Sequence, residues 1–191
     1  MAGEPQSTTE QINRYARALD SAKKLTSSVR PEELGMATPC EGWDVRALVT
    51  HMIGTNGRFA AGVSGQPAPA APAADADPIA AYQASADNAL AAWRAPGAFD
   101  RTLPLPAGEV PATAAIGMIF VDQLIHTWDL AKALGRGDAL PDDLAMAALA
   151  NAQQRMTPDR RGPGKPYGPE IQVAADAPIQ DRLAGFLGRR P

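Results

Sequence analysis

Between Ile116 and Ile125 the chain is apolar on almost every side of a predicted helix that runs from about Ala112 to Leu134. A helix with no polar face is stable in water only when other protein segments surround it. Gly135 follows the last helical position and is typical of a helix C-terminus. This segment therefore needs packing partners on several sides, and it favours a bundle of helices.

Other segments of the chain supply the partners that this helix needs. Apolar residues recur in them at spacings of three and four, as in amphipathic helices. Residues 101–111 look extended, but their prolines exclude a central strand. We therefore expect an all-α fold, a four-helix bundle with short extra helices and a small extended segment. The expected additional helices cover residues 8–29, 44–63, 78–93, 141–157 and 179–187.

The length and composition of the chain are those of a single domain. The chain has 191 residues, of which 45% are hydrophobic, so it is long enough for one domain with a buried core. We expect a single helical domain over residues 1–191. Residues 64–77, rich in proline and alanine, are expected to form a flexible crossover loop, and residues 160–178 a loop before the last short helix.

Charge and cysteine content exclude several classes of function. A formal net charge of −3 gives no general attraction to nucleic acid or to an anionic membrane. A single Cys forms neither an internal disulfide nor a cysteine-rich zinc site. No apolar run is long enough to cross a bilayer, and the polar N-terminus does not resemble a signal peptide. We therefore expect a cytoplasmic protein without nucleic-acid or membrane partners.

Three residues form the strongest candidate for chemistry. Asp122 and His126 interrupt the apolar helix and, being four residues apart, lie on one of its faces. His51, the only other histidine, lies on the flank of an apolar stripe in the second helix. Two imidazoles and a carboxylate are a ligand set of catalytic zinc and of non-haem iron. The alternative is an Asp–His hydrogen bond or a salt bridge to an arginine, with unrelated structural roles for the two histidines. From the residues alone, this structural interpretation is preferred.

Other residues give weaker signals. Asp129, three residues after His126, would hydrogen-bond a ligand histidine, or it would be a plain surface carboxylate. Cys40 precedes a helix N-terminus, a place where thiols can be reactive, but an ordinary loop cysteine is the preferred interpretation. The arginine pairs at 160–161 and 189–190 are expected to be solvated.

The surroundings of both histidines resemble two motifs of a known family. The first motif is Thr38-Pro39-Cys40-Glu41-Gly42-Trp43-Asp44-Val45-Arg46 with Leu48, Val49 and His51, and the second is Asp122 with His126-Thr127-Trp128-Asp129-Leu130-Ala131. With Tyr167-Gly168-Pro169 and residues 181–189, they are similar to the DinB/YfiT-like metalloprotein superfamily. The resemblance is closest to the actinobacterial branch related to the metal-binding domain of mycothiol-dependent maleylpyruvate isomerase.

The resemblance implies a fold and a ligand set. The fold is an up-down-down-up bundle in which residues 64–77 cross over between the second and third helices. The ligands of a divalent metal would be His51, Asp122 and His126, with zinc as the first expectation and nickel or iron as alternatives. The isomerase has Glu at the position of Asp122. In such enzymes a small thiol, here mycothiol, is activated by the metal to attack an electrophile, so Cys40 would not be the nucleophile.

Three functions remain open after this resemblance. The first is a mycothiol-dependent S-transferase or isomerase whose partners are a small thiol and a small electrophile. The second is a non-enzymatic metal- or ligand-binding bundle without thiol turnover, and the third is a purely structural protein without metal. Proteins of this class often pair through their helices, so a homodimer is also compatible with the resemblance.

Overall fold

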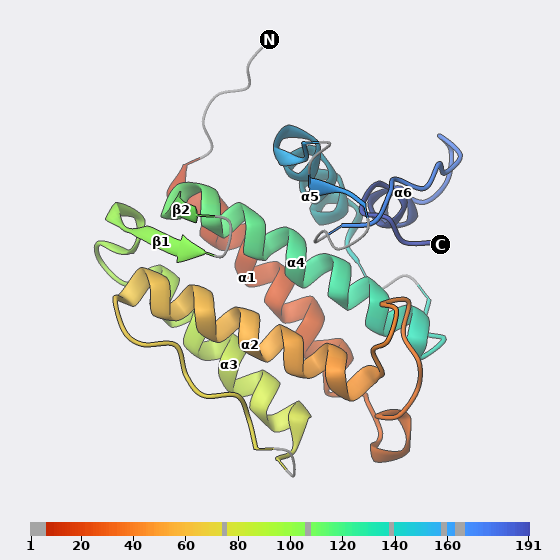
Figure 1. Cartoon of the computed structure of the whole chain (residues 1–191), viewed down its shortest axis with the longest axis horizontal. Coiled ribbons are helices and arrows are strands. Elements are labelled where there is room, and N and C mark those ends of the chain that lie inside the picture. The colour runs from red at the N-terminus through yellow and green to blue at the C-terminus, as the bar shows by residue number, and fades with distance from the viewer. Residues whose placement is uncertain (1–6, 74–75, 106–107, 138–139, 158–159, 163–166) are drawn as a thin grey trace.

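Four long helices lie side by side in the computed structural model of the chain (Figure 1). The structure describes residues 7–73, 76–105, 108–137, 140–157, 160–162 and 167–191. In Figure 1, the first and fourth helices run in one direction, and the second and third run in the opposite direction. The expected up-down-down-up bundle is therefore confirmed. Its helices are α1 (Thr8–Thr26), α2 (Val45–Ser64), α3 (Pro78–Arg94) and α4 (Ala112–Ala133).

Capping side chains explain where two of these helices begin. Ser7 Oγ accepts a hydrogen bond from the Glu10 backbone N–H at 3.2 Å. Asp44 Oδ1 accepts one from the Ala47 N–H at 2.8 Å. The first N–H groups of a helix have no partner within the helix, so each cap satisfies one of them and fixes the starting residue.

The first helix ends earlier than its apolar spacing predicts. It stops at Thr26 rather than at Val29. The N–H groups of Ser28 and Val29 bond to carbonyls three residues back, which tightens the chain out of the α pattern. A short 3-10 helix, η1 (Pro31–Glu33), follows.

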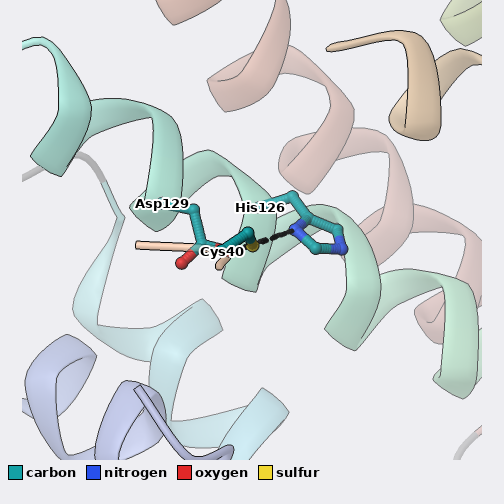
Figure 2. Close-up of side chains that lie close together, drawn as sticks. All are labelled: Cys40, His126 and Asp129. Atoms are coloured by element: carbon teal, nitrogen blue, oxygen red, sulfur yellow. Dashed lines mark hydrogen bonds and ion pairs between the residues drawn. The ribbon is translucent and has the colours of Figure 1, made fainter. Parts of the chain in front are cut away.

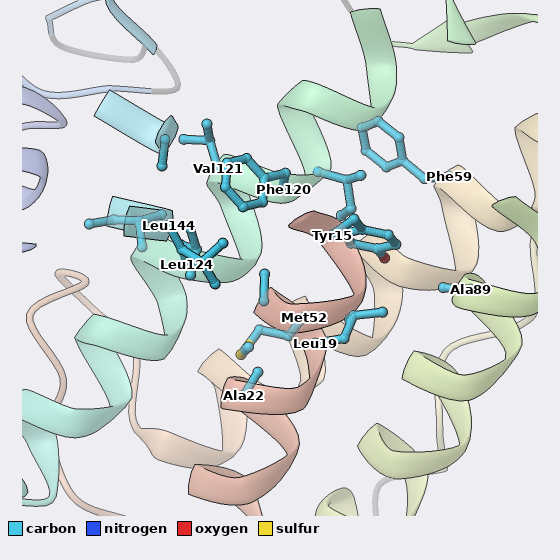
Figure 3. Packing of buried hydrophobic residues seen from close by; sticks show 14 of the residues in the cluster. Tyr15, Leu19, Ala22, Met52, Phe59, Ala89, Phe120, Val121, Leu124 and Leu144 are labelled. Atoms are coloured by element: carbon cyan, nitrogen blue, oxygen red, sulfur yellow. The ribbon is translucent and has the colours of Figure 1, made fainter. Parts of the chain in front are cut away.

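The core fills the space between the helices, and α4 lies at its centre. Every residue of α4 from Ile119 to Ala131 is buried except Asp122, so the prediction of a helix surrounded by protein is confirmed. The other helices contribute large side chains to the same core. Figure 3 shows part of this packing, with Tyr15, Leu19, Met52, Phe59, Phe120, Leu124 and Leu144.

The predicted extended segment is a two-stranded antiparallel hairpin, β1 (Thr102–Leu105) with β2 (Gly108–Pro111). Leu103 is fully buried and packs against α2 at Gly62, where a Cβ would lie 2.7 Å from Leu103 Cγ. Within the described residues the hairpin pairs with no further strand, as its prolines require. The predicted turn includes Ala107, which lies outside the described residues.

Residues 65–77 join α2 to α3. The cap of α2 is Gly65, whose φ of 66° lies in the left-handed region that favours glycine. From the sequence, Gly54 and Gly57 either end α2 early or allow close packing. Neither glycine ends the helix, because α2 continues to Ser64. Gly57 allows close packing, since a Cβ there would lie 2.6 Å from Pro69 Cγ, whereas a Cβ on Gly54 would meet no atom within 4 Å.

The chain after α4 folds back against the outer side of that helix. It contains α5 (Asp142–Arg155) and α6 (Ile179–Phe186), which pack on each other and on α4. The Trp128 indole N–H donates to Asp181 Oδ1 at 3.0 Å, which joins α4 to α6. These contacts bring the C-terminal residues back to the helix that carries Asp122 and His126. No helix in the described ranges combines the length and the apolar character that crossing a membrane requires.

Candidate metal centre

The fold brings together the three residues that the sequence selects as ligands. His51 comes from α2, while Asp122 and His126 come from successive turns of α4. Both histidine Nε2 atoms lie 3.6 Å from Asp122 Oδ1. One ligand atom from each residue lies within 4.8 Å of the other two. The bundle thus produces the cluster, because α2 packs on the face of α4 that carries both residues.

Opposite charges dominate the electrostatics of this cluster. Burial raises the pKa of Asp122, but the charges and hydrogen bonds of His126 and His51 outweigh burial and leave that pKa well below its ordinary value. Burial lowers the pKa of His126, but Asp122 and Asp129 outweigh it and leave that pKa well above its ordinary value. Without metal, Asp122 and His126 therefore form an ion pair at neutral pH.

Asp129 holds the other side of the His126 ring. Its Oδ2 atom lies 3.0 Å from His126 Nδ1, and its side chain is fully buried. A hydrogen bond from Nδ1–H to this carboxylate fixes the ring and directs Nε2 toward Asp122, so that Nε2 offers its lone pair to a metal ion once it has released its own proton. The structure thus places the Asp129 carboxylate against the candidate ligand His126 and buries it, so it is not a plain surface carboxylate.

The structure adds two residues that sequence reasoning placed elsewhere. The Cys40 thiol donates to Asp129 Oδ2 at 3.0 Å, and its sulfur lies 3.9 Å from His126 Nδ1 (Figure 2). Arg189 donates to both carboxylate oxygens of Asp129 at 3.1 and 3.2 Å, and to Cys40 Sγ at 3.3 Å. Its side chain is only 15% exposed, so the expectation that Arg189 is a solvated tail charge is wrong. The sequence gives one indirect signal for Arg189. If Asp129 is buried, its carboxylate needs a cationic partner.

A cavity of about 780 Å³ opens beside the three candidate ligands. The indole of Trp43 forms one wall, with its ring centre 4.7 Å from that of His51. This volume is in the range of small-molecule binding sites. The remaining lining residues that the argument uses come from the loop before α2 and from the C-terminal part of the chain: Cys40, Glu41, Tyr167, Arg189 and Arg190.

The chemistry of the three residues fits a divalent metal ion. Asp122 Oδ2 is buried and has no hydrogen-bond partner among the described residues, although an unpaired buried carboxylate oxygen is costly. Ligand atoms that share a tetrahedral zinc ion at about 2.1 Å lie about 3.4 Å from each other. The two Nε2–Oδ1 separations of 3.6 Å are close to that value. His51 and His126 would contribute Nε2, Asp122 would contribute a carboxylate oxygen, and the cavity would leave room for a further ligand.

Comparisons with known proteins agree with this fold. The family model described as the mycothiol maleylpyruvate isomerase N-terminal domain matches residues 15–131. Two uncharacterized proteins from different strains of Mycobacterium tuberculosis are each 41% identical over 179 residues, which cover 92% of this chain and 95% of theirs. The crystal structure of the mycothiol-dependent maleylpyruvate isomerase superposes with a TM-score of 0.59 at 18% identity, over 76% of this chain and 68% of that one. The chain therefore belongs to the mycothiol maleylpyruvate isomerase N-terminal domain family.

Proposed function

We propose that this protein binds one divalent metal ion through His51, Asp122 and His126 and catalyses the reaction of a small thiol with a small electrophile. The observation that carries the proposal is the convergence of three ligand atoms within 4.8 Å at the wall of a cavity large enough for both reactants. Zinc is the first candidate, because two imidazoles and one carboxylate with an open position form a catalytic zinc ligand set. The same donors also suit nickel or iron.

Mycothiol is the thiol that we propose. The names of the matching family and of the structural relative both refer to mycothiol, which supports this choice. A metal ion bound at the three ligands would favour the thiolate form of a thiol beside it and so supply a nucleophile at neutral pH. The protein would act as an S-transferase or an isomerase, depending on whether the thiol stays on the product.

Three residues around the ligands have different roles in this proposal. Asp129 orients His126, and Trp43 forms an apolar wall that keeps water away from one side of the ligands. Cys40 is engaged with Asp129 and Arg189, so its thiol is not free to attack a substrate. The nucleophile is therefore the small thiol and not a side chain of the protein.

Metal analysis of the untagged protein tests the first half of the proposal. We expect about one metal ion per chain in the wild type and almost none in a variant that combines His51→Ala with His126→Ala. Glu41→Gln is the matched control, because Glu41 lines the same cavity without belonging to the ligand cluster. A wild-type protein that takes up no metal, even after incubation with zinc and dialysis, would contradict the proposal.

Turnover tests the second half. We expect the wild type to accelerate the reaction of mycothiol with a chlorinated dinitrobenzene or another general electrophile, and we expect no acceleration by the double variant. Metal binding without any acceleration over a panel of thiols and electrophiles would favour the second candidate function, a non-enzymatic metal- or ligand-binding bundle. The well-formed cluster itself supports that alternative, since it requires no second reactant.

A further inference from the structure

Two clusters of potential metal ligands share the imidazole of His126. The first is the proposed site, which uses Nε2 together with His51 and Asp122. The second uses Nδ1 together with Cys40 Sγ and Asp129 Oδ2, and these three atoms also lie within 4.8 Å of one another. A thiolate, an imidazole and a carboxylate suit zinc or cadmium as well as the first set does. Ligand type alone therefore does not decide where a metal binds.

Arg189 distinguishes the two clusters. Its guanidinium forms two hydrogen bonds to the Asp129 carboxylate, at 3.1 and 3.2 Å, and one to Cys40 Sγ at 3.3 Å. Asp129 is fully buried, and the Arg189 side chain is 15% exposed. A metal ion in the second cluster would face this cation directly and would have to displace it from the carboxylate. The first cluster has no corresponding ion pair with an arginine or lysine in the described part of the chain.

We infer that Arg189 is a positioning residue that closes the Cys40–His126–Asp129 cluster to metal and keeps His126 Nε2 available to the proposed site. The inference rests on the proposed metal site and adds the reason for its location. Arginine suits this task because it stays protonated and its planar fork matches a carboxylate with two parallel hydrogen bonds. In the sequence this residue lies outside the segment 15–131 that the family model matches.

Removing the guanidinium should open the second cluster. Arg189→Met keeps an unbranched side chain and removes the positive charge, which leaves the Asp129 carboxylate and the Cys40 thiol without a cation beside them. A thiophilic metal ion can then bind there. Cys40 releases its thiol proton and His126 releases its Nδ1 proton to the buffer, and Sγ and Nδ1 bond to the ion. No oxidation state changes in this step.

Cadmium alone is the probe, because a bond from thiolate to cadmium gives an ultraviolet charge-transfer band that nitrogen and oxygen ligands do not give. For metal-free, untagged wild-type protein we expect one cadmium per chain without this band. For Arg189→Met we expect bound cadmium with the band, and the band should be lost when Cys40→Ser is added. Arg190→Met is the matched control, since Arg190 lines the same cavity and forms no ion pair with the described residues. It should behave as the wild type does.

A second readout uses the wild type alone and does not depend on the folding of any variant. Nitrogen NMR of the metal-free protein, recorded at a pH high enough for the His126 ring to be neutral, should show the remaining proton on Nδ1, because Asp129 accepts it. A thiolate–cadmium band in the wild type, or a neutral His126 protonated on Nε2, would overturn the inference and leave the proposed function intact. A folded Arg189→Met protein that binds one cadmium without the band would also overturn it. A wild type that binds no cadmium would instead overturn the proposed site, and the inference with it.

Discussion

His126 Nδ1 lies 3.0 Å from Asp129 Oδ2, and His126 Nε2 lies 3.6 Å from Asp122 Oδ1 on the opposite side of the ring. One imidazole therefore lies between two carboxylates of the same helix, four residues after Asp122 and three residues before Asp129. Asp129 is fully buried, whereas Asp122 retains 26% of its side-chain exposure. The buried carboxylate orients the ring, and the accessible one faces the cavity.

The first prediction follows from this arrangement. Asp129→Asn keeps the shape of the side chain but removes the charge that holds the Nδ1 proton, so His126 loses its fixed orientation. Partners of this kind typically contribute about 10- to 100-fold in metal affinity. We expect a loss of that size in zinc affinity, measured by competition with a chelator of known affinity. Asp181→Asn is the control, since Asp181 contacts Trp128 and Lys132 and not the ligands. Equal affinities for wild type and Asp129→Asn would contradict the assigned role.

Much of the bundle could be predicted from the sequence, because the spacing of apolar residues along a helix shows which of its faces are buried. The apolar run around Ile119 requires a surrounded helix, and the structure buries it on all sides. The pair Asp122 and His126 is visible for the same reason, since a four-residue step places both on one face. The placement of His51 beside them depended on how α2 packs against α4. That placement required the family resemblance in addition to the spacing.

The contacts of Arg189 could not be predicted in this way. It reaches Asp129 across 60 residues and Cys40 across 149 residues of sequence. Nothing local distinguishes it from Arg190, its exposed neighbour. The difference arises only when α6 docks on α4 and turns one of the two side chains inward. Long-range ion pairs of this kind depend on tertiary packing, and neither composition nor periodicity encodes them.

A second prediction concerns the buried hydrogen bond from the Tyr15 hydroxyl to Asn56 Oδ1, at 3.0 Å. Both residues are fully buried, so Tyr15→Phe leaves the Asn56 oxygen without its donor and without water. An unsatisfied buried acceptor costs about 1–3 kcal/mol. We expect a loss of that size in the free energy of unfolding, measured with urea. Tyr167→Phe is the control, because Tyr167 lines the cavity, and it should leave the free energy nearly unchanged. Equal stabilities of the two variants would contradict the prediction.

The third prediction compares two glycines of α2. An alanine Cβ at Gly54 would meet no atom within 4 Å, whereas at Gly62 it would lie 2.7 Å from Leu103 Cγ. Gly54→Ala should therefore stabilise the protein by about 0.5–1 kcal/mol through helix propensity alone. Gly62→Ala should destabilise it by about 1–3 kcal/mol, because the buried Leu103 must move to make room. Urea unfolding of both variants measures the difference, and shifts of the same sign would contradict the packing of the hairpin on α2.

The fourth prediction concerns Glu33, a nearly buried carboxylate near the C-terminal end of α1. It accepts a hydrogen bond from the Arg30 N–H at 2.8 Å, and both of its oxygens accept from Arg136 at 2.9 and 3.1 Å. The bond from the Arg30 N–H, opposed by burial and helped by the charge of Arg136, lowers the pKa of Glu33 below its ordinary value. The ionised carboxylate therefore stabilises the fold.

The lowered pKa sets the direction of the pH dependence. Stabilisation by Glu33 is fully present above the ordinary pKa of glutamate, about 4.3, and is lost as the pH falls through the lowered pKa of the folded state. We expect Glu33→Gln to melt at a lower temperature than wild type at neutral pH, and this difference should shrink steadily below about pH 4. Glu32→Gln is the control, because the ion pair of Glu32 with Arg30 is exposed and such pairs contribute little. A difference for Glu33→Gln that stays constant down to acid pH would show that the side chain acts through its shape and not through its charge.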